Sequence, residues 1–470
     1  MRVFEFEPFC LCLQARSWRG AVRISPKVAK LMARAWLPRS VLAKFRICSN
    51  WWRGQYSHYR SGRTDHSARM PPISSPDCTG GAPQRTSFNW FLACTFASAF
   101  GRNGYHIACA WILVAEGFGS PAVAVYFAII SVAELMASPL AGWMSDRLDR
   151  RLLYVFADAF RFAAILALGA IVIVADLRWA IWVSAVVFAS CDRIALTASQ
   201  SMIPSVTAHI KLSTGNSIAF FLTQAGSLFA AALTGLLLHI TTPACTFALL
   251  SLAFALSVGL MLAVGQEGVV YRPDASGPVP RLIFDGQLLQ LSAIYALLYT
   301  GGVLVSVIGP SFVFDELAGT AMVFGQLESA WSAGSIVGAL LLIPLVRAAR
   351  VSVLQFVILG LTACSFATLK VLELPWSLLS FAILGTLYNL GRVAVEVMLQ
   401  SCVPIAALGR AKGALHSAGV LLGVILFGFI AIAGNTVRPS SFFLAYAVVL
   451  AAGTLFLSIW RVSDTSDGAR

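Results

Sequence analysis

Residues 142–151 read Gly-Trp-Met-Ser-Asp-Arg-Leu-Asp-Arg-Arg, a short charged break between two long apolar runs at 121–144 and 153–175. Each run has the length of a helix that crosses a bilayer, about 20 residues. Inside lipid the backbone must satisfy its own hydrogen bonds, so each run is expected to be helical. The break is therefore predicted to be a tight loop between two membrane-spanning helices.

The same pattern continues along the chain, which is 58% hydrophobic and only 12% charged over 470 residues. An average soluble domain is about a quarter charged, so an ordinary soluble globule is excluded. We predict an all-α integral membrane protein with twelve transmembrane helices. They are expected near 88–112, 121–144, 153–175, 178–200, 214–238, 243–264, 287–309, 320–344, 352–370, 375–398, 411–434 and 440–460.

An internal repeat divides these helices into two sets of six. Gln-Ser-Met-Ile-Pro at 200–204 ends the fourth run, and Gln-Ser-Cys-Val-Pro at 400–404 ends the tenth. Such a duplication is typical of transporters built from two pseudo-symmetric halves. The predicted segments are a basic tail at 1–86, a first six-helix half at 87–264, a cytoplasmic linker at 265–286, a second half at 287–461 and a short tail at 462–470.

The N-terminal tail carries most of the net charge of +13, because residues 1–86 hold 15 of the 34 Lys and Arg residues and 4 of the 21 acidic ones. Three interpretations stay open. The stretch 28–47 is compatible with a basic amphipathic segment on an anionic leaflet. The tail also fits an Arg-rich targeting peptide. It fits equally a poorly ordered or non-native segment upstream of a start at Met70.

Basic residues in the loops predict the orientation of the helices in the membrane. With the N-terminus inside, the inner segments after the second helix hold twelve Lys and Arg residues and the outer loops hold three. Both termini are therefore expected to face the cytoplasm.

The loop at 142–151 resembles the loop 2–3 signature of the major facilitator superfamily, through Gly142, Asp146, Arg147, Arg150 and Arg151. The position of Asp149 is usually Gly in that family, which implies a different turn here. A Gly at a helix end lets a neighbouring backbone approach. A carboxylate beside cations can pair within the loop or bond a facing helix N-terminus, and so hold one access state closed.

Within this superfamily, residues 202–238 resemble prokaryotic exporters of the enterobactin-type siderophore and drug classes. The matching residues are Ile203, Pro204, Asn216, Ser217 and Gln224-Ala-Gly226. The resemblance implies an efflux protein of the cell inner membrane. The fifth helix also echoes an antiporter motif in its small residues, Gly226, Ala230, Ala231, Thr234 and Gly235.

Ionisable residues within the predicted spans need a partner or a function, because a charge in the bilayer centre is costly. Asp158 and Arg161 are three residues apart on one helix and are predicted to form a structural pair. Arg392 and Glu396 are four apart and are also predicted to pair. Family members line their central cavity with the first, fourth, seventh and tenth helices. The resemblance then implies cavity or substrate residues Arg102, His106, Arg193, Tyr295, Tyr299, Arg392 and Glu396.

Glu134 and Glu328 have no cation one turn away on their own helices. A carboxylate without a cation in a low dielectric can bind and release a proton near neutral pH. These two residues and Asp192 are the predicted proton carriers. The alternative is that the buried charges form static pairs between helices.

We expect a secondary active transporter, a proton-coupled exporter of small amphipathic molecules such as siderophores or drugs, working by alternating access. An uptake carrier or facilitator of the same fold, and a non-transporting receptor or scaffold, remain alternatives. The expected partners are a small-molecule substrate, protons and the lipid bilayer, and the expected state is a monomer. No enzyme motif, metal site, cofactor or nucleic-acid partner is predicted from the sequence.

Overall fold

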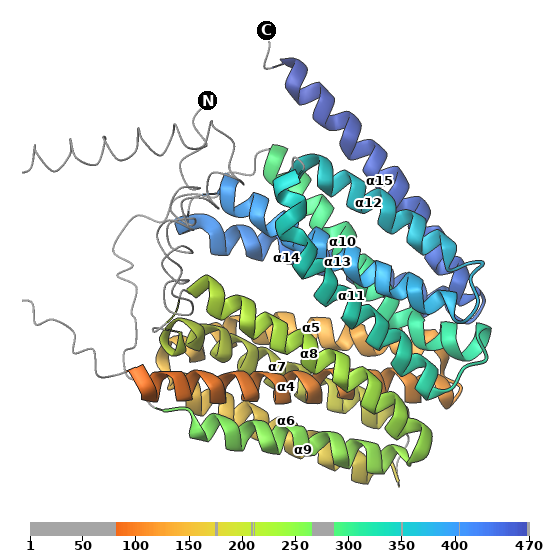
Figure 1. Cartoon of the computed structure of the whole chain (residues 1–470). Helices are drawn as coiled ribbons and strands as arrows, with labels where there is room; N and C mark the ends of the chain where they lie inside the picture. The colour runs from red at the N-terminus through yellow and green to blue at the C-terminus, as the bar shows by residue number, and fades with distance from the viewer. Residues whose placement is uncertain are drawn as a thin grey trace, which may run out of the picture. The chain divides into compact units, whose positions relative to one another are not determined.

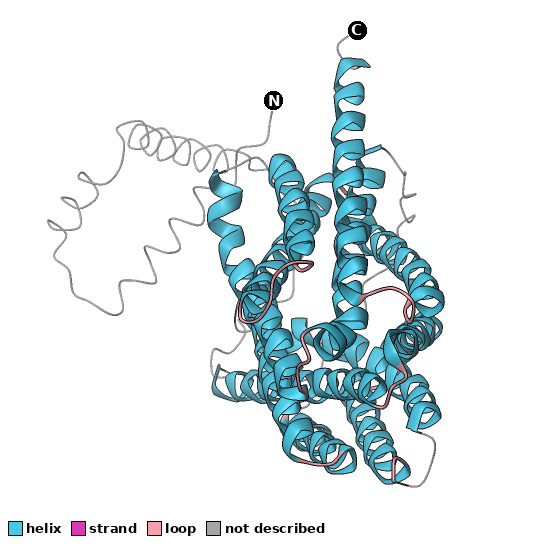
Figure 2. Cartoon of the chain, turned by 90° about the vertical axis from the view of Figure 1, so that its right-hand side faces the viewer, coloured by secondary structure: helices cyan, strands magenta, loops and turns pink. Residues whose placement is uncertain are grey.

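A computed structural model describes the protein at residues 81–173, 177–207, 210, 212–265, 286–348, 351–403 and 405–467. This described part is helical throughout and contains no strand (Figure 2). The predicted basic tail lies outside the described residues as far as residue 80, and so does the predicted linker between residues 266 and 285.

Six helices precede the linker and six follow it in the described part of the chain. The first set is α4 (Gly81–Ala115), α5 (Gly119–Arg147), α6 (Arg150–Ile171), α7 (Leu177–Val206), α8 (Leu212–Ile240) and α9 (Pro243–Ala263). The second set is α10 (Gly286–Ser311), with a π-helical extension η2 (Phe312–Glu316), then α11 (Ala321–Ala348), α12 (Val351–Thr368), α13 (Trp376–Cys402), α14 (Ile405–Ala433) and α15 (Pro439–Asp467).

Each set packs as a group of its own, which we call the N-group (α4–α9) and the C-group (α10–α15) (Figure 1). In the N-group, α4 packs on α8 and α9, and α6 packs on α7 and α9. In the C-group, α11 packs on α13, α10 on α14 and α12 on α15. The groups meet along two helix pairs, α5 with α14 and α8 with α11. The predicted all-helical fold of two six-helix groups is confirmed.

Nine of the described helices are long and apolar enough to cross a membrane. Their outward faces expose large apolar side chains such as Met136, Phe160 and Ile432, which a bilayer would cover. The apolar described part of α12, Val353–Thr368, is shorter than a typical span. The middle of the α4 sequence contains the polar residues Arg102 and Asn103.

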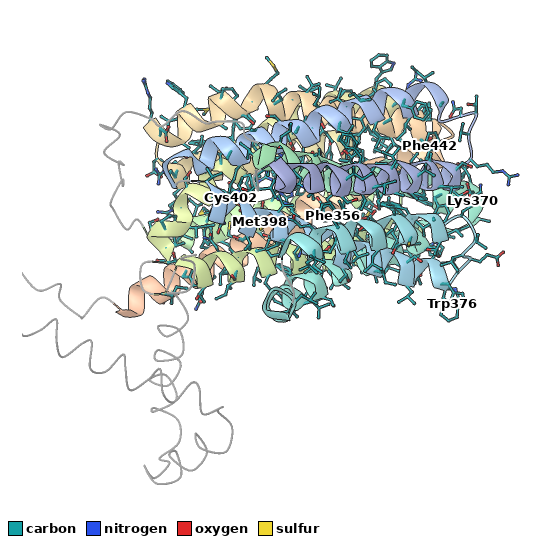
Figure 3. All side chains as sticks on the ribbon, turned by 90° about the horizontal axis from the view of Figure 1, so that it is seen from above. Phe356, Lys370, Trp376, Met398, Cys402 and Phe442 are labelled. Atoms are coloured by element: carbon teal, nitrogen blue, oxygen red, sulfur yellow. The ribbon has the colours of Figure 1, made fainter. Side chains whose placement is uncertain are left out.

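Consecutive helices run in opposite directions, so the bundle has two ends. Figure 3 places Lys370, Trp376 and Phe442 near one end of the helices and Cys402 toward the other. We call the end that carries residues 147–151 and 403 the basic end, and the end that carries residues 116–118 and 434–438 the opposite end.

Local sequence explains where the helices begin and turn. The Asp149 side chain accepts hydrogen bonds from the backbone N–H groups of Arg151 (2.8 Å) and Leu152 (3.1 Å), and so caps the start of α6. The turn between α4 and α5 needs two glycines, because Gly117 and Gly119 have φ angles of +83° and +66°. The predicted different turn at Asp149 is thus a helix cap rather than a glycine turn.

Candidate functional site

Arg161 of α6 is the centre of a buried charge cluster in the N-group. Its guanidinium donates to Asp158 on the same helix and to Asp192 Oδ1 on α7 at 2.5 Å. It also donates to Ser98 Oγ of α4 at 3.1 Å. One arginine therefore ties together α4, α6 and α7.

The surroundings of Arg161 help to offset the cost of burying these charges. Asp158 Oδ2 accepts a 2.5 Å hydrogen bond from Ser257 Oγ of α9. The rings of Phe254 and Phe188 lie 4.7 Å and 5.9 Å from the guanidinium carbon. Hydrogen bonds and cation–π contacts of this kind compensate desolvation inside a protein.

Arg102 of α4 extends the cluster toward the middle of the molecule. Its Nη1 lies 3.8 Å from Asp192 Oδ2, so Asp192 is held between two arginines. Charges of alternating sign therefore run from Asp158 through Arg161 and Asp192 to Arg102. One turn along α4, His106 Nδ1 forms a 2.9 Å hydrogen bond with the Tyr126 hydroxyl of α5.

Glu134 of α5 lies beside this cluster without joining it. The carboxylate interacts electrostatically with Arg102, Asp192 and Arg193. No cation lies within ion-pair distance of it among the described residues. Of the three predicted proton carriers, Asp192 is already engaged by cations and Glu134 is not.

Glu328, the remaining predicted proton carrier, lies on α11 near Gly309 of α10. It has no ion-pair partner in the part of the chain that the structure describes. No hydrogen bond or ion pair joins it to the Arg161 cluster among the described residues.

Three ring-bearing residues of the C-group, Tyr295, Tyr299 and His416, lie together, and we call them the aromatic wall. Tyr295 and Tyr299 of α10 stack with ring centroids 6.1 Å apart and planes 15° apart. His416 of α14 meets the Tyr299 ring edge-on at 5.7 Å. Gly419 of α14 lies against these rings, and a Cβ there would come 3.0 Å from Tyr299 and 3.2 Å from Tyr295.

The predicted pair between Arg392 and Glu396 is wrong, since no ion pair joins them among the described residues. Glu396 instead pairs with Lys412 of α14, and both side chains are about 43–44% exposed. Arg392 interacts electrostatically with Tyr388 and Tyr295. The packing of α13 against α14 thus supplies a cation that the sequence of α13 alone does not indicate.

The loop at 142–151 ties helix ends together through its last two arginines. Arg150 donates to the backbone oxygens of Ser145 (3.2 Å) and Ser201 (2.9 Å). Arg151 donates to the oxygen of Met261 (3.1 Å) at the C-terminal end of α9. Guanidinium groups at helix C-termini satisfy free carbonyls and complement the helix dipole.

The first part of the loop signature is more open. Asp146 and Arg147 are exposed, and the Arg147 guanidinium lies 5.1 Å from the Trp143 ring. No described atom lies within 4 Å of the point where a Cβ of Gly142 would be. The close backbone approach expected at Gly142 is therefore not present among the described residues.

Contacts that join the two groups gather toward the opposite end. Ser120 Oγ of α5 donates to the Gly434 oxygen after α14 at 3.2 Å. Trp111 of α4 stacks on Phe324 of α11 at 5.7 Å. Gly235 of α8 faces Gly325 of α11 so closely that a Cβ on Gly235 would be 2.7 Å from the Gly325 Cα. At the basic end, Gly413, like Gly142, has open space around its Cβ position.

Sequence reasoning missed His416, Tyr388 and Lys412. His416 interacts electrostatically with Arg193 of α7 and Arg392 of α13, and so lies between the two groups. Tyr388 is one turn before Arg392, and that spacing could have drawn attention to it. His416 and Lys412 are on the eleventh helix, and nothing in the sequence indicates that this helix contributes to the cavity.

Comparisons with known proteins identify the fold and leave the substrate unspecified. The model of the family described as Major Facilitator Superfamily matches residues 91–419. No curated protein sequence matches the chain.

Solved structures resemble the chain at low sequence identity. The nucleoside transporter NupG is 12% identical, and the match covers 79% of this chain and 98% of NupG with a TM-score of 0.63. A bacterial homologue of the iron transporter ferroportin, in an inward-facing state, is 18% identical and covers 79% of this chain and 97% of its own, with a TM-score of 0.63. A bacterial homologue of the human lysosomal transporter Spinster, also inward-facing, is 14% identical, covers 81% and 96%, and has a TM-score of 0.60. At these identities the likeness concerns the fold alone.

Proposed function

The chain belongs to the major facilitator superfamily, and we propose that it is a proton-coupled exporter of small amphipathic molecules that works by alternating access. Members of this family are transporters rather than enzymes, and they carry small molecules across a lipid bilayer. In the proposed orientation the basic end faces the cytoplasm and the protein lies in a bacterial inner membrane. Proton coupling and alternating access are proposed from the charged residues described above.

The observation that carries the proposal is the charge cluster of the N-group together with Glu134 beside it. Glu134 interacts electrostatically with Arg102 and Asp192 of the N-group and with Tyr299 of the C-group, and Tyr299 interacts in turn with Arg392. In the alternating-access mechanism two halves rock about a central site. Contacts between the groups at the opposite end, with open positions at the basic end, support a state that is open toward the cytoplasm.

Proton coupling is assigned first to Glu134. It lies beside the cluster and has no ion-pair partner among the described residues, and it interacts with three other charges whose balance changes when it gains a proton. Glu328 is the second candidate because it lies apart from all described cations. Asp192 is the third candidate and the least suited, because two arginines already hold it.

Export is proposed from the resemblance of residues 202–238 to siderophore and drug exporters. The solved relatives have titles that name a nucleoside transporter and homologues of an iron and a lysosomal transporter. They support small polar or amphipathic cargo in general and leave the direction to experiment.

Everted membrane vesicles with an acidic lumen test both parts of the proposal. Addition of a transported siderophore or amphipathic drug is expected to raise the lumenal pH, because substrate enters the lumen in exchange for protons. With Glu134→Gln the pH response is expected to fall to the level of vesicles without the protein, because the amide cannot bind a proton. Glu116→Gln, which removes an exposed carboxylate at the opposite end, is the matched control and should respond like the parent.

Three results would contradict parts of the proposal. An unchanged proton response with Glu134→Gln would exclude this residue as the carrier. Substrate that moves together with protons, rather than against them, would identify an uptake carrier of the same fold. Absence of any transport across the whole panel would favour a receptor or scaffold.

A further inference from the structure

We propose that the cavity binds an aromatic organic anion, with the anionic group between Arg193 of α7 and Arg392 of α13. The inference rests on the proposed function, since it assigns a substrate class to the same site. It stands on the partners of the charged side chains and on the aromatic wall of the C-group.

Arg193 is a cation without a counter-ion in the described structure. Its neighbour in the sequence, Asp192, is already held by Arg161 and Arg102. The Arg193 Nε atom is buried and has no hydrogen-bond partner. A buried N–H of a charged group that lacks an acceptor is costly, so an acceptor from a ligand would be favourable here.

Arg392 enters the same region from the C-group. Its side chain is exposed, and the nearby carboxylate of Glu396 is paired with Lys412. His416 interacts electrostatically with both Arg392 and Arg193, although these arginines belong to different groups. Both guanidinium groups therefore lie within electrostatic range of one imidazole ring.

The charged side chains of this region leave a positive excess. Asp158 and Asp192 balance Arg161 and Arg102, and Glu396 pairs with Lys412. Glu134 interacts electrostatically with Arg193, and Glu396 also interacts with Arg392. Five cations therefore stand against four carboxylates, an excess of one positive charge. A site with this balance attracts anions and repels cations.

The aromatic wall identifies the rest of the ligand. Tyr295 and Tyr299 offer a stacked pair of rings beside Arg392, and His416 meets Tyr299 edge-on. On the other side of the wall Tyr388 packs on Trp331, with ring centroids 5.3 Å apart. Flat apolar groups bind well against such ring faces and edges. A carboxylate or similar anion attached to an aromatic ring therefore suits both features.

An anion bound between Arg193 and Arg392 would also connect the two groups. Each guanidinium can form charge-assisted hydrogen bonds with it, so the ligand draws α7 and α13 together. Such a contact favours closure of the basic end around the substrate. The inside-negative membrane potential favours the exit of an anion, which is the direction of the exchange against protons proposed above.

Calorimetric titration of the purified protein with three probes of similar shape tests the inference. The probes are 1-naphthoate, the neutral 1-naphthylmethanol and the cation 1-naphthylmethylammonium. Naphthoate is expected to bind most tightly. Arg193→Gln and Arg392→Gln should each weaken naphthoate binding about 10- to 100-fold, as expected for loss of a charge-assisted hydrogen bond, and should leave the binding of the alcohol unchanged. Arg438→Gln removes an equal charge from an exposed position at the opposite end and should have no effect.

Conservative variants guard against loss of folding. Arg193→Lys and Arg392→Lys keep the charge, so they should retain the preference for naphthoate over the cation with weaker affinity. Melting temperatures of all variants confirm that they are folded. Equal binding of the three probes, absence of binding by all three, or Arg193→Gln and Arg392→Gln variants that bind naphthoate as tightly as the parent would overturn the inference.

The anion site and the proposed transport function can each fail while the other holds. Arginine-dependent binding of naphthoate without transport in vesicles would support the anion site and contradict the transporter. Proton-coupled transport of neutral or cationic drugs, with no arginine-dependent anion binding, would support the transporter and contradict the anion site.

Discussion

Replacement of Arg161 with methionine is expected to lower the free energy of unfolding by about 3–5 kcal/mol, enough to abolish most of the folded protein. The variant leaves Asp158 and Asp192 buried without their shared cation. It also removes the hydrogen bond to Ser98, which links α6 to α4. Yield of monodisperse protein and the midpoint of unfolding in a denaturing detergent measure the effect.

A triple variant separates the loss of the charge from the loss of packing. Asp158→Asn and Asp192→Asn added to Arg161→Met remove all three charges and leave only the half-buried Arg102 without its partner, so they are expected to restore a large part of the stability. Lys412→Met breaks the exposed pair with Glu396 and should cost at most about 1 kcal/mol. If Arg161→Met is no more damaging than Lys412→Met, the cluster is not the structural centre of the N-group.

The second large effect is expected from Gly325→Leu, which should lower the transport rate about tenfold or more while the protein stays folded. Gly325 of α11 lies against Gly235 of α8, so a leucine there has no room, and under the proposed mechanism this contact opens when the opposite end opens. Overpacking costs about 1–3 kcal/mol, and each 1.4 kcal/mol shifts the ratio of two states by about tenfold. The variant therefore favours the state in which the opposite end is open. Uptake of labelled substrate into vesicles measures the rate.

Gly334→Leu is the matched comparison on the same helix. Gly334 packs against the backbone of Ala382 on α13, within the C-group, so its contact persists in both access states. We expect this change to lower the melting temperature strongly, whereas Gly325→Leu lowers it little. Equal destabilisation by the two substitutions would show that the contact between Gly235 and Gly325 is permanent.

The helices were predictable because apolar runs of bilayer length leave few alternatives. Every predicted run overlaps one helix of the structure, and the prediction of two sets of six follows from the repeat at 200–204 and 400–404. The structure adds that α4 begins at Gly81, before the predicted first run at 88–112, and that α15 continues to Asp467. The helix ends are less predictable, because polar residues are tolerated wherever a helix leaves the bilayer.

The charged site was only partly predictable, for a reason that lies in helix packing. Spacing on one helix indicates that Asp158 and Arg161 share a face, and the structure pairs them. The same reasoning fails for Arg392 and Glu396, because Lys412 of a neighbouring helix reaches Glu396. Partners on different helices, such as Asp192 for Arg161, depend on which helices are neighbours. Sequence spacing carries no such information.

His416 also shows that sequence spacing does not reveal contacts between different helices. A single histidine on an apolar helix gives no indication of a site. It becomes significant only when α14 places it next to Tyr299 and near Arg193 and Arg392.

The most direct test of alternating access is a pair of distance measurements between spin labels, in a background without native cysteines. One pair, Gly142→Cys with Gly413→Cys, spans the two groups at the basic end, where both positions have open space. The other pair, Glu116→Cys with Val437→Cys, spans them at the opposite end, where both residues are exposed. Distances are recorded between pH 5 and pH 8, with and without 1-naphthoate. The account predicts two distance populations for each pair, with the basic pair shortening as the opposite pair lengthens. Fixed distances at both ends, or changes in the same direction, would contradict it.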